Sequence, residues 1–181
     1  MKKKILTLCL AAIMCVSFAA CGGNETNKTE SSVEVPKETN DSKYYFKDGV
    51  MQAEDVKIEI TDYKIVPAGS EGNTFSGKDE IVFYYNVTNL SGKESVSTNS
   101  WIVFLEAQQD NDPNVVNKLD IGFYFDDNVQ FDATENIKKG GTVSAYIAYQ
   151  LDDNTTPVIL KATRGIGGED LGEQIFNLTS E

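Results

Sequence analysis

Cys21 is the residue whose neighbours point most directly to a chemical reaction. It follows Ala19 and Ala20, which come after lysines at residues 2–4 and an apolar run over residues 5–18. This layout is typical of a bacterial lipoprotein signal, in which the cysteine thiol receives a diacylglyceryl group and becomes the first residue of the mature chain. An ordinary secretory signal, with Cys21 incidental, is the alternative. Because the cysteine directly follows two small residues, we predict lipid attachment at Cys21.

The apolar run also indicates how the chain relates to the membrane. Residues 5–18 are fewer than the ~20 apolar residues that a helix needs to cross a bilayer. We therefore predict that residues 1–20 are a signal peptide that is removed after export. The acylated Cys21 would then hold the protein at the extracytoplasmic face of the cell membrane, since two or more acyl chains bind a bilayer stably.

The chain lacks most of the side chains that enzymes use. It contains no histidine, and of its three cysteines Cys9 and Cys15 lie in the predicted signal peptide while Cys21 is the predicted acylation site. Histidine-based catalysis, thiolate chemistry and zinc sites built from histidine or cysteine are thereby excluded. We predict a protein that is not an enzyme and binds no cofactor. A hydrolase that works with carboxylates alone is the enzymatic alternative, although no spacing singles out a pair of acids.

The chain is strongly acidic. Its formal net charge is −12, and removal of residues 1–20 takes away three lysines and no acid. A surface of this sign repels nucleic acid phosphates and anionic lipid headgroups. We predict no nucleic acid partner, and we expect the folded part to stand off the membrane to which the lipid anchors it.

Residues 21–43 are predicted to be the lipidated cysteine and a disordered tether. The segment has no aromatic residue, and Val33 and Val35 are its only sizeable apolar side chains. Such a composition cannot offset the entropy that is lost when a chain becomes ordered. As a flexible coil, the 22 residues after Cys21 would hold the domain on the order of 25 Å from the bilayer.

From Tyr44 onward the sequence has the pattern of short strands. Apolar and polar residues alternate in successive runs, clusters of Gly, Asn, Asp and Ser separate these runs, and Asp48-Gly49 suits a tight hairpin turn. This spacing predicts an all-β domain over residues 44–181, an immunoglobulin-like antiparallel β-sandwich, with a closed barrel as the alternative. A single helical turn would fit residues 114–120. The strands are expected at residues 44–46, 50–51, 56–61, 79–89, 101–107, 119–125, 143–151, 158–162 and 175–178.

Several separated segments occur in a combination that is known from other sequences. They are residues 86–89, 109–113 and 137–143, followed by residues 149–153. With these segments, most of residues 44–178 resembles a family of small Gram-positive lipoproteins that carry an immunoglobulin-like domain of unknown function. The resemblance implies a sandwich fold and surface anchoring, and it supplies no catalytic or ligand-binding residue.

Asp110, Asp112 and Asn114 alternate like the first half of a calcium-binding loop. The pattern then fails, because Val115 replaces the turn glycine and Ile121 stands where a bidentate glutamate would be. We therefore favour an acidic turn between strands, in which the Asp side chains accept bonds from nearby backbone amides. A calcium site of another type is the alternative, and it could recruit Asp120, Asp126 or Asp127.

The reverse faces of the predicted strands carry a second candidate site. If they were uncovered, their apolar and aromatic side chains would form a platform for a partner protein or a sugar. We expect instead that the N-terminal hairpin or the long connection at residues 109–136 covers part of these faces. The side chains concerned are Val82, Tyr84, Ile102, Phe104 and Tyr146.

The predictions together describe a lipid-anchored, non-enzymatic binding module. We expect it to dock an envelope protein through its loops or an exposed sheet face. The alternative is a module that binds the cell wall or another glycan, with or without calcium. Fold alone does not separate these two, since sandwiches of this type serve many unrelated binding tasks.

Overall fold

The computed structural model describes residues 43–93, 96–129 and 135–178. The predicted signal peptide, the lipid attachment site at Cys21 and all of the predicted tether except Lys43 lie outside the described residues. Within these three ranges, no helix is long and apolar enough to cross a membrane.

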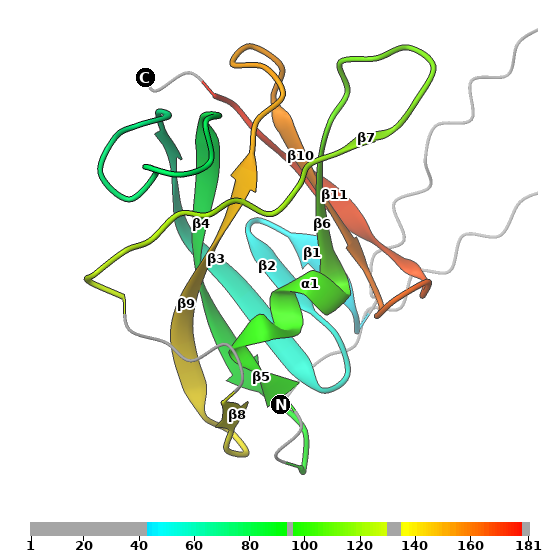
Figure 1. Ribbon diagram of the computed structural model, residues 1–181. Helices are drawn as coiled ribbons and strands as arrows, with labels where there is room; N and C mark the ends of the chain where they lie inside the picture. Colours follow the sequence, from blue (N-terminus) through cyan, green and yellow to red (C-terminus); the bar gives the residue numbers. More distant parts are fainter. Residues whose placement is uncertain (1–42, 94–95, 130–134, 179–181) are drawn as a thin grey trace, which may run out of the picture. The chain divides into compact units, whose positions relative to one another are not determined.

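The described residues form two antiparallel sheets that pack against each other (Figure 1). The first sheet has the strand order β1-β2-β3-β4-β9, and the second has the order β11-β10-β6-β7. A third, two-stranded sheet joins β5 to β8. The strands are β1 (Tyr45–Lys47), β2 (Val50–Gln52), β3 (Val56–Val66), β4 (Glu80–Asn89), β5 (Val96–Ser97), β6 (Leu105–Gln109), β7 (Asn117–Lys118), β8 (Asn136–Ile137), β9 (Thr142–Gln150), β10 (Val158–Thr163) and β11 (Asp170–Phe176).

The strand order confirms the predicted immunoglobulin-like sandwich. An immunoglobulin domain places its strands A, B and E in one sheet and its strands C, F and G in the other. Here β3, β4 and β9 lie side by side in the first sheet, and β6, β10 and β11 lie side by side in the second, in the corresponding chain order. The chain changes sheet between β4 and β6 and again between β9 and β10, so the predicted barrel alternative is wrong.

The predicted alternation places the core side chains correctly in the long strands. On β4, Ile81, Phe83, Tyr85 and Val87 are buried in the main core, together with the matching inward side of β9. The predicted hairpin is also present, since β1 pairs with β2 and Asp48-Gly49 has positive φ at both positions, as a two-residue turn of this kind requires. This hairpin extends the edge of the first sheet, and it contacts β11 of the second sheet, where the Gly49 N–H donates to Gln174 Oε1 at 2.7 Å.

Trp101 lies at the centre of the core. Its side chain is fully buried, and its ring centroid is 4.5 Å from that of Tyr85 and 5.6 Å from that of Phe83. The indole Nε1 donates a hydrogen bond of 2.9 Å to the hydroxyl of Tyr149 on β9. The Trp101 side chain therefore contacts both β4 and β9, although its own segment leads into the second sheet.

The prediction of a strand beginning at residue 101 is wrong. Residues Thr98–Ser100 form a 3-10 turn (η1) and Trp101–Phe104 form a short helix (α1), so the strand begins only at Leu105. The cause is the change of sheet, because the chain must turn before it joins β10. Ser97 and Ser100 cap this turn reciprocally, and Trp101 reaches the core from a helical position while Ile102 and Val103 remain exposed.

The predicted strand at residues 119–125 and the predicted helical turn at residues 114–120 are also wrong. Residues 117–118 form β7, and the following residues make only an isolated bridge, between Ile121 and Tyr149. The chain then leaves the edge of β9 and crosses the outer face of the first sheet. Its apolar residues alternate in sequence, but most of them lie outside the main core and remain exposed.

The two ends of the sandwich carry different sets of loops (Figure 1). We call the end at which the chain enters at Lys43 the proximal end; it holds the turns at residues 53–55, 90–93, 138–141 and 164–169. The distal end holds the loops at residues 67–79, 110–116 and 151–157. At the proximal end, Arg164 lies 4.2 Å from the centroid of the Tyr44 ring and pairs with Glu54 at 3.2 Å.

Candidate functional site

The outer face of the first sheet is covered in part, as we predicted, by the connection at residues 109–136, through its described residues 122–126. Val66, Val82 and Ala148 form a small buried cluster there, beneath the partly buried rings of Tyr84, Tyr124 and Tyr146. Tyr124 comes from the connection, whereas Tyr84 and Tyr146 come from β4 and β9. The open aromatic platform that was the alternative is therefore not present at Tyr84 and Tyr146.

A hydrogen-bond network fixes these three tyrosines around Asp126, two through its carboxylate and one through its backbone N–H. The hydroxyl of Tyr84 donates to Asp126 Oδ2 at 2.6 Å, and the hydroxyl of Tyr124 donates to the same oxygen at 3.2 Å. The backbone N–H of Asp126 donates to the Tyr146 hydroxyl at 3.2 Å. On its other side, Asp126 Oδ1 accepts the backbone N–H of Asn128 at 2.9 Å.

The network changes the acidity of its members. The hydrogen bond from Tyr84, followed by that from the Asn128 backbone, lowers the pKa of Asp126 from 3.8 to about 2. Burial, followed by the bond to Asp126, raises the pKa of Tyr84 well above its usual range. Asp126 is therefore ionised and Tyr84 is protonated at neutral pH, which is the pairing that this hydrogen bond needs.

Lys64 on β3 adds a positive charge beside the rings. Its Nζ lies 5.2 Å from the ring centroid of Tyr84 and 4.9 Å from that of Tyr124. Both distances are within the range of cation–π attraction. The ammonium group thus stabilises the covered face and also contributes to the rim of the cleft described below.

Glu80 holds residues 122 and 123 of the connection against the first sheet. Its side chain is fully buried, and its Oε1 accepts the backbone N–H of Phe123 at 2.9 Å. Gly122 fits closely against this carboxyl group, because a Cβ at that position would lie 2.7 Å from Oε1. The Gly122 N–H also donates to the carbonyl of Ala148 at 2.8 Å. The connection is thus fixed through its backbone while its phenylalanine rings point away from the core.

A cleft opens where the connection meets the distal loop at residues 67–79. Gly72 joins the two segments, because its carbonyl accepts the N–H of Phe125 at 2.9 Å. Gly72 has φ +83°, and a Cβ there would overlap the Tyr124 ring and lie 2.7 Å from the Phe125 carbonyl oxygen. The cleft has a volume of about 450 Å³ and is lined by Lys64, Glu71, Gly72, Thr74, Phe75, Tyr124, Phe125, Asp126, Asp127 and Asn128.

Phenylalanine rings stand exposed at this cleft. Phe75 in the distal loop is 87% exposed, and Phe125 in the connection is 66% exposed. Exposed apolar side chains that gather at a hollow mark a site for a ligand or partner more often than single exposed residues do. The cleft therefore combines two exposed rings with a floor that hydrogen bonds hold in place.

Comparison with known proteins assigns the chain to a family. A family model described as a domain of unknown function (DUF5067) matches residues 31–164, which is well over half of the sequence. The chain belongs to the DUF5067 family. The match begins inside the predicted tether and ends before β11. The family carries no assigned activity.

A solved structure shares the fold of this DUF5067 chain. It is described as a "putative lipoprotein" from Staphylococcus aureus subsp. aureus NCTC 8325, and it superposes with a TM-score of 0.60 at 21% sequence identity. The alignment covers 73% of this chain and 90% of that chain. No curated protein matches the sequence. The resemblance to a lipoprotein family of unknown function, predicted from the sequence, is confirmed.

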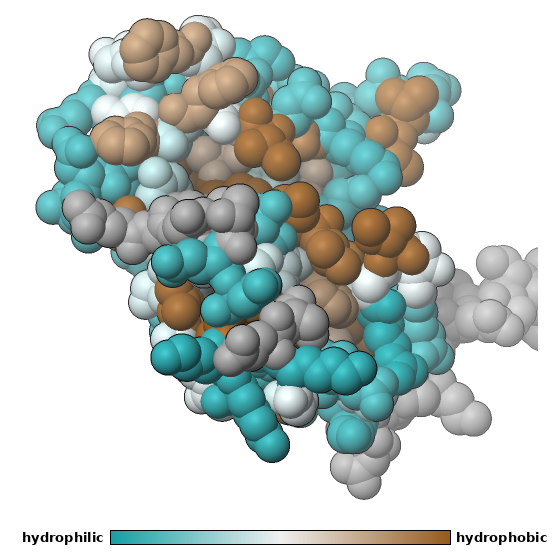
Figure 2. Space-filling view, turned by 60° about the horizontal axis from the view of Figure 1, so that its bottom comes forward, coloured by the Kyte–Doolittle hydropathy of each residue, from teal (hydrophilic) through white to brown (hydrophobic). Residues whose placement is uncertain are grey.

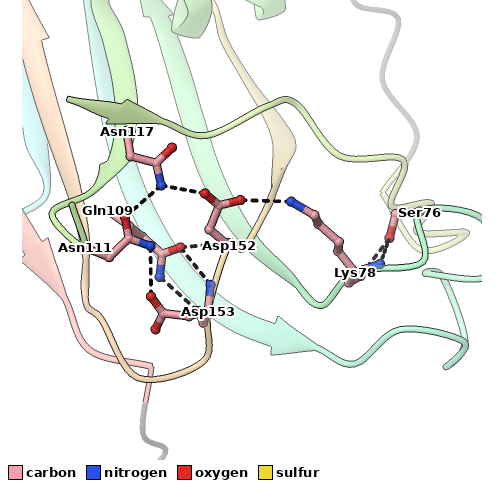
Figure 3. A network of polar contacts seen from close by, with 7 residues as sticks. All are labelled: Ser76, Lys78, Gln109, Asn111, Asn117, Asp152 and Asp153. Atoms are coloured by element: carbon pink, nitrogen blue, oxygen red, sulfur yellow. Dashed lines mark hydrogen bonds and ion pairs between the residues drawn. The ribbon is translucent and has the colours of Figure 1, made fainter. Parts of the chain in front are cut away.

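A second polar network ties the distal loops of the DUF5067 domain together (Figure 3). Gln109 is fully buried and donates through Nε2 to the carbonyls of Asp153 and Thr156, at 2.9 and 2.7 Å. Asp152 pairs with Lys78 at 2.9 Å and accepts a bond from Asn117 at 2.7 Å. Loops that adjoin three different strand pairs are thus held in one arrangement.

This network also lowers the pKa values of its carboxyl groups. The bond from Lys78, followed by that from Asn117, lowers the pKa of Asp152. The backbone N–H of Thr156, followed by the side chain of Asn111, lowers the pKa of Asp153 well below its usual range. Both carboxylates are therefore charged at neutral pH and at moderately acidic pH.

The residues proposed for a calcium site do not converge. Asp110 and Asp112 are exposed, and Asp112 Oδ1 accepts the backbone N–H of Asn114 at 2.7 Å, as expected for the favoured acidic turn. Asp126 and Asp127 line the cleft at the connection instead. Among the described residues, no group of three or more acidic side chains is placed to hold a metal ion.

Sequence reasoning identified part of this site and missed the rest. It named Tyr84 and Tyr146 and the connection that covers them, but it missed Phe75, Lys64 and Gly72. The available signal for Phe75 was an aromatic residue inside a loop rich in Gly and Ser, outside any alternating run. Of the other platform candidates, Val82 is buried, Phe104 packs against the main core from α1, and Ile102 is exposed on α1.

Proposed function

We propose that this chain is a lipid-anchored protein of the extracytoplasmic face whose domain is a non-enzymatic binding module. An envelope protein docks at the cleft between the distal loop at residues 67–79 and the connection at residues 123–128. The observation that supports this most is the pair of exposed rings, Phe75 and Phe125, at a cleft with a fixed floor. Aromatic anchors of this kind contribute much of the binding energy at protein interfaces.

The prearranged floor lowers the cost of binding. Tyr84, Tyr124 and Asp126 already hold one another in place, so a partner does not have to order them. Side chains that are immobilised only on binding each reduce the affinity, and prearranged side chains avoid this loss. The cleft is therefore suited to recognition without rearrangement of the sheet.

The charge of the distal end favours a partner with a basic surface. Eight described acidic residues lie in the distal loops or at the cleft, and Lys78 and Lys64 are the lysines among them. Complementary charge speeds encounter and selects the partner. The acidic residues are Glu71, Asp79, Asp110, Asp112, Asp126, Asp127, Asp152 and Asp153.

The chemistry of the cleft supports binding rather than catalysis. A catalytic carboxylic acid needs a pKa near the working pH, and proteins reach it by raising the pKa of Asp or Glu. The network instead lowers the pKa of Asp126, and both oxygens of that carboxylate accept hydrogen bonds. Asp126 thus acts as a fixed acceptor that orients Tyr84 and Tyr124.

A glycan is the second candidate ligand, and one feature of the cleft favours it. Thr74, Asn128 and Asp127 bring a hydroxyl, an amide and a carboxylate beside the exposed rings. Sugars offer many hydroxyl groups to such donors and acceptors and can lie flat against an aromatic ring. A wall polysaccharide could therefore occupy the cleft in place of a protein segment.

A pull-down from detergent-solubilised cells tests the proposal. We expect the full chain to recover a specific envelope protein, and we expect Phe75→Ala and Phe125→Ala to lose it. Ile175→Ala is the matched control, since it removes an exposed apolar side chain on the second sheet. Recovery that falls as salt rises supports a basic protein partner. Recovery of wall fragments alone selects the glycan, and equal recovery by all variants contradicts the role of the cleft.

A further inference from the structure

We infer that the proximal end of the domain docks on the surface of a phospholipid bilayer, through exposed side chains of α1 and of the β10–β11 turn. This inference goes beyond the binding function of the cleft and rests only on the proposed anchoring at Cys21. It names a second surface, at the opposite end of the sandwich, with a lipid surface as its partner.

The proximal end carries an exposed aliphatic patch. Ile166, at the tip of the β10–β11 turn, is 88% exposed, and Ile102 on α1 is 46% exposed. Val103 lies beside Ile102, and a groove of about 440 Å³ separates this side of α1 from the turn. Figure 2 turns this end toward the reader and shows strongly hydrophobic side chains at its surface. We call Ile102, Val103 and Ile166 the proximal patch.

The path of the chain places the bilayer at this end. Described residues begin at Lys43, and the ring of the next residue, Tyr44, is stacked under Arg164 of the same turn that carries Ile166. The predicted lipid at Cys21 is separated from Lys43 by a short segment of chain, whose coil length is on the order of 25 Å. Because the tether keeps the bilayer near the proximal patch, the effective concentration of lipid is high, and a contact of low intrinsic affinity is enough for docking.

The distribution of charge also orients the domain. The net charge of the chain predicts repulsion from anionic lipids, but the described proximal residues hold as many basic as acidic groups, whereas the distal loops and cleft are strongly acidic. Anionic headgroups therefore repel the distal end and not the proximal end. The proximal residues are Lys43, Lys93, Lys138, Lys139 and Arg164, with Glu54, Asp55, Glu135, Glu169 and Asp170.

This placement revises the expectation that the folded part stands off the membrane. That expectation used the total charge, which does not report where the charges lie. An end whose described basic and acidic groups are equal in number, and which exposes aliphatic side chains, can bury these side chains at the headgroup boundary, as interfacial helices do. In this orientation the cleft with Phe75 and Phe125 faces away from the bilayer.

The single tryptophan provides the probe for a test. Trp101 is the only tryptophan of the chain, and it is the neighbour of Ile102 on α1. The chain from Cys21 onward also has one thiol, which can be coupled to a maleimide phospholipid. The coupled protein is placed on vesicles of equal parts phosphatidylcholine and phosphatidylglycerol, with or without nitroxide on the headgroups. The quenching of Trp101 fluorescence by nitroxide is then measured.

We expect nitroxide lipids to reduce Trp101 fluorescence, and we expect Ile102→Ser with Ile166→Ser to restore it. Ile175→Ser is the matched control, because it changes an exposed isoleucine toward the distal end of the second sheet. Ile166→Ser alone, at an exposed turn, keeps the test valid if the double variant does not fold. Equal fluorescence with and without nitroxide would overturn the inference. Association of two copies of the protein through their proximal patches, in place of contact with lipid, would also overturn it. Coupling in vitro makes this result independent of whether cells acylate Cys21.

Discussion

Tyr149 shows how a single residue can secure the core of this domain. Its hydroxyl accepts the indole N–H of Trp101 at 2.9 Å in a fully buried setting. Burial raises the pKa of Tyr149 to about 12, so the hydroxyl remains protonated through the physiological range. The pair joins β9 to the segment that leads into the second sheet, and removal of either partner leaves a polar group without a bond.

We predict that Tyr149→Phe lowers the free energy of unfolding by about 1–3 kcal/mol, because the Trp101 N–H loses its acceptor in a buried site. Urea unfolding followed by Trp101 fluorescence measures the change. Tyr45→Phe, which removes the hydroxyl of a ring on β1 that is 37% exposed, is the control and should change stability by less than about 0.5 kcal/mol. An equal effect of both substitutions would show that the buried bond contributes nothing.

Asp126 gives the protein a specific dependence on pH. Its pKa in the folded domain is about 2, which is below its unfolded value of 3.8. A carboxyl group with a lowered folded pKa contributes stability that is present above the unfolded pKa and is lost as pH falls through the folded pKa. The contribution of Asp126 is therefore lost between these two values.

We predict that Asp126→Asn reduces the loss of stability between pH values near 4 and near 2, relative to the unchanged chain. Denaturant unfolding at several pH values in this window measures the slope. Asp127→Asn, which alters the adjacent exposed carboxylate, is the matched control and should leave the slope unchanged. Identical slopes for all three proteins would contradict the network around Asp126.

At the scale of elements, the cleft depends on how the distal loop meets the connection. Gly72 is the contact point, with positive φ and no space for a side chain. Gly77, in the same loop, also has positive φ, at +70°, but a Cβ there would meet nothing within 4 Å. Alanine at Gly77 therefore measures the loss of stability from the backbone conformation alone, whereas alanine at Gly72 adds the loss from steric overlap.

We predict that Gly77→Ala costs about 1–2 kcal/mol of stability, the usual cost of a left-handed conformation for a residue with a Cβ. Gly72→Ala should cost about 1–3 kcal/mol more, because its Cβ also displaces the Tyr124 ring. Thermal or urea unfolding measures both. The Gly72 variant should in addition lose the partner in the pull-down, whereas the Gly77 variant should retain it; equal behaviour would contradict the role of Gly72.

The elements that could be predicted are those whose side chains alternate into a core. Apolar residues on β4 and β9 repeat with period two and are buried as expected. The same alternation at residues 101–107 and 119–125 failed, because periodicity reports which side chains are apolar and not where the chain changes direction. At residues 101–104 the chain changes sheet and therefore turns. At residues 119–125 the chain lies across the outer face of β4 and β9, where a small cluster from these strands is already buried.

The cleft could not be predicted because it depends on a contact between distant segments. Gly72 and Phe125 lie far apart in the sequence, and the alternating run that contains Phe125 predicts a strand rather than a contact with the loop at residues 67–79. The tyrosines of β4 and β9 could be predicted as a cluster, since antiparallel pairing sets Tyr84 opposite Tyr146. The residues that form the cleft beside this cluster come from loops, and a sequence pattern does not predict which loop residues contact each other.

At the scale of the whole molecule, the domain has two unlike ends. The proximal end is joined to the predicted anchor and carries aliphatic side chains with balanced charge, and the distal end is acidic and carries the cleft. This arrangement suits a protein that is held at a membrane and binds a partner away from it.

We predict that cells fed with labelled palmitate incorporate the label into the full chain and not into a Cys21→Ala variant. The reason is that Cys21 is the only thiol left after removal of residues 1–20. The unlabelled variant should also appear in the soluble extracellular fraction. Labelling of both proteins would contradict lipid attachment at Cys21.

Photo-crosslinking in intact cells tests whether a partner binds at the cleft. A benzophenone amino acid replaces Phe75 in the full-length protein, and the same amino acid replaces Ile175 in a parallel control. We predict that the Phe75 position crosslinks to a specific envelope partner and that the Ile175 position does not. The same products from both positions, or no product from Phe75, would contradict the assignment of the cleft as the binding site.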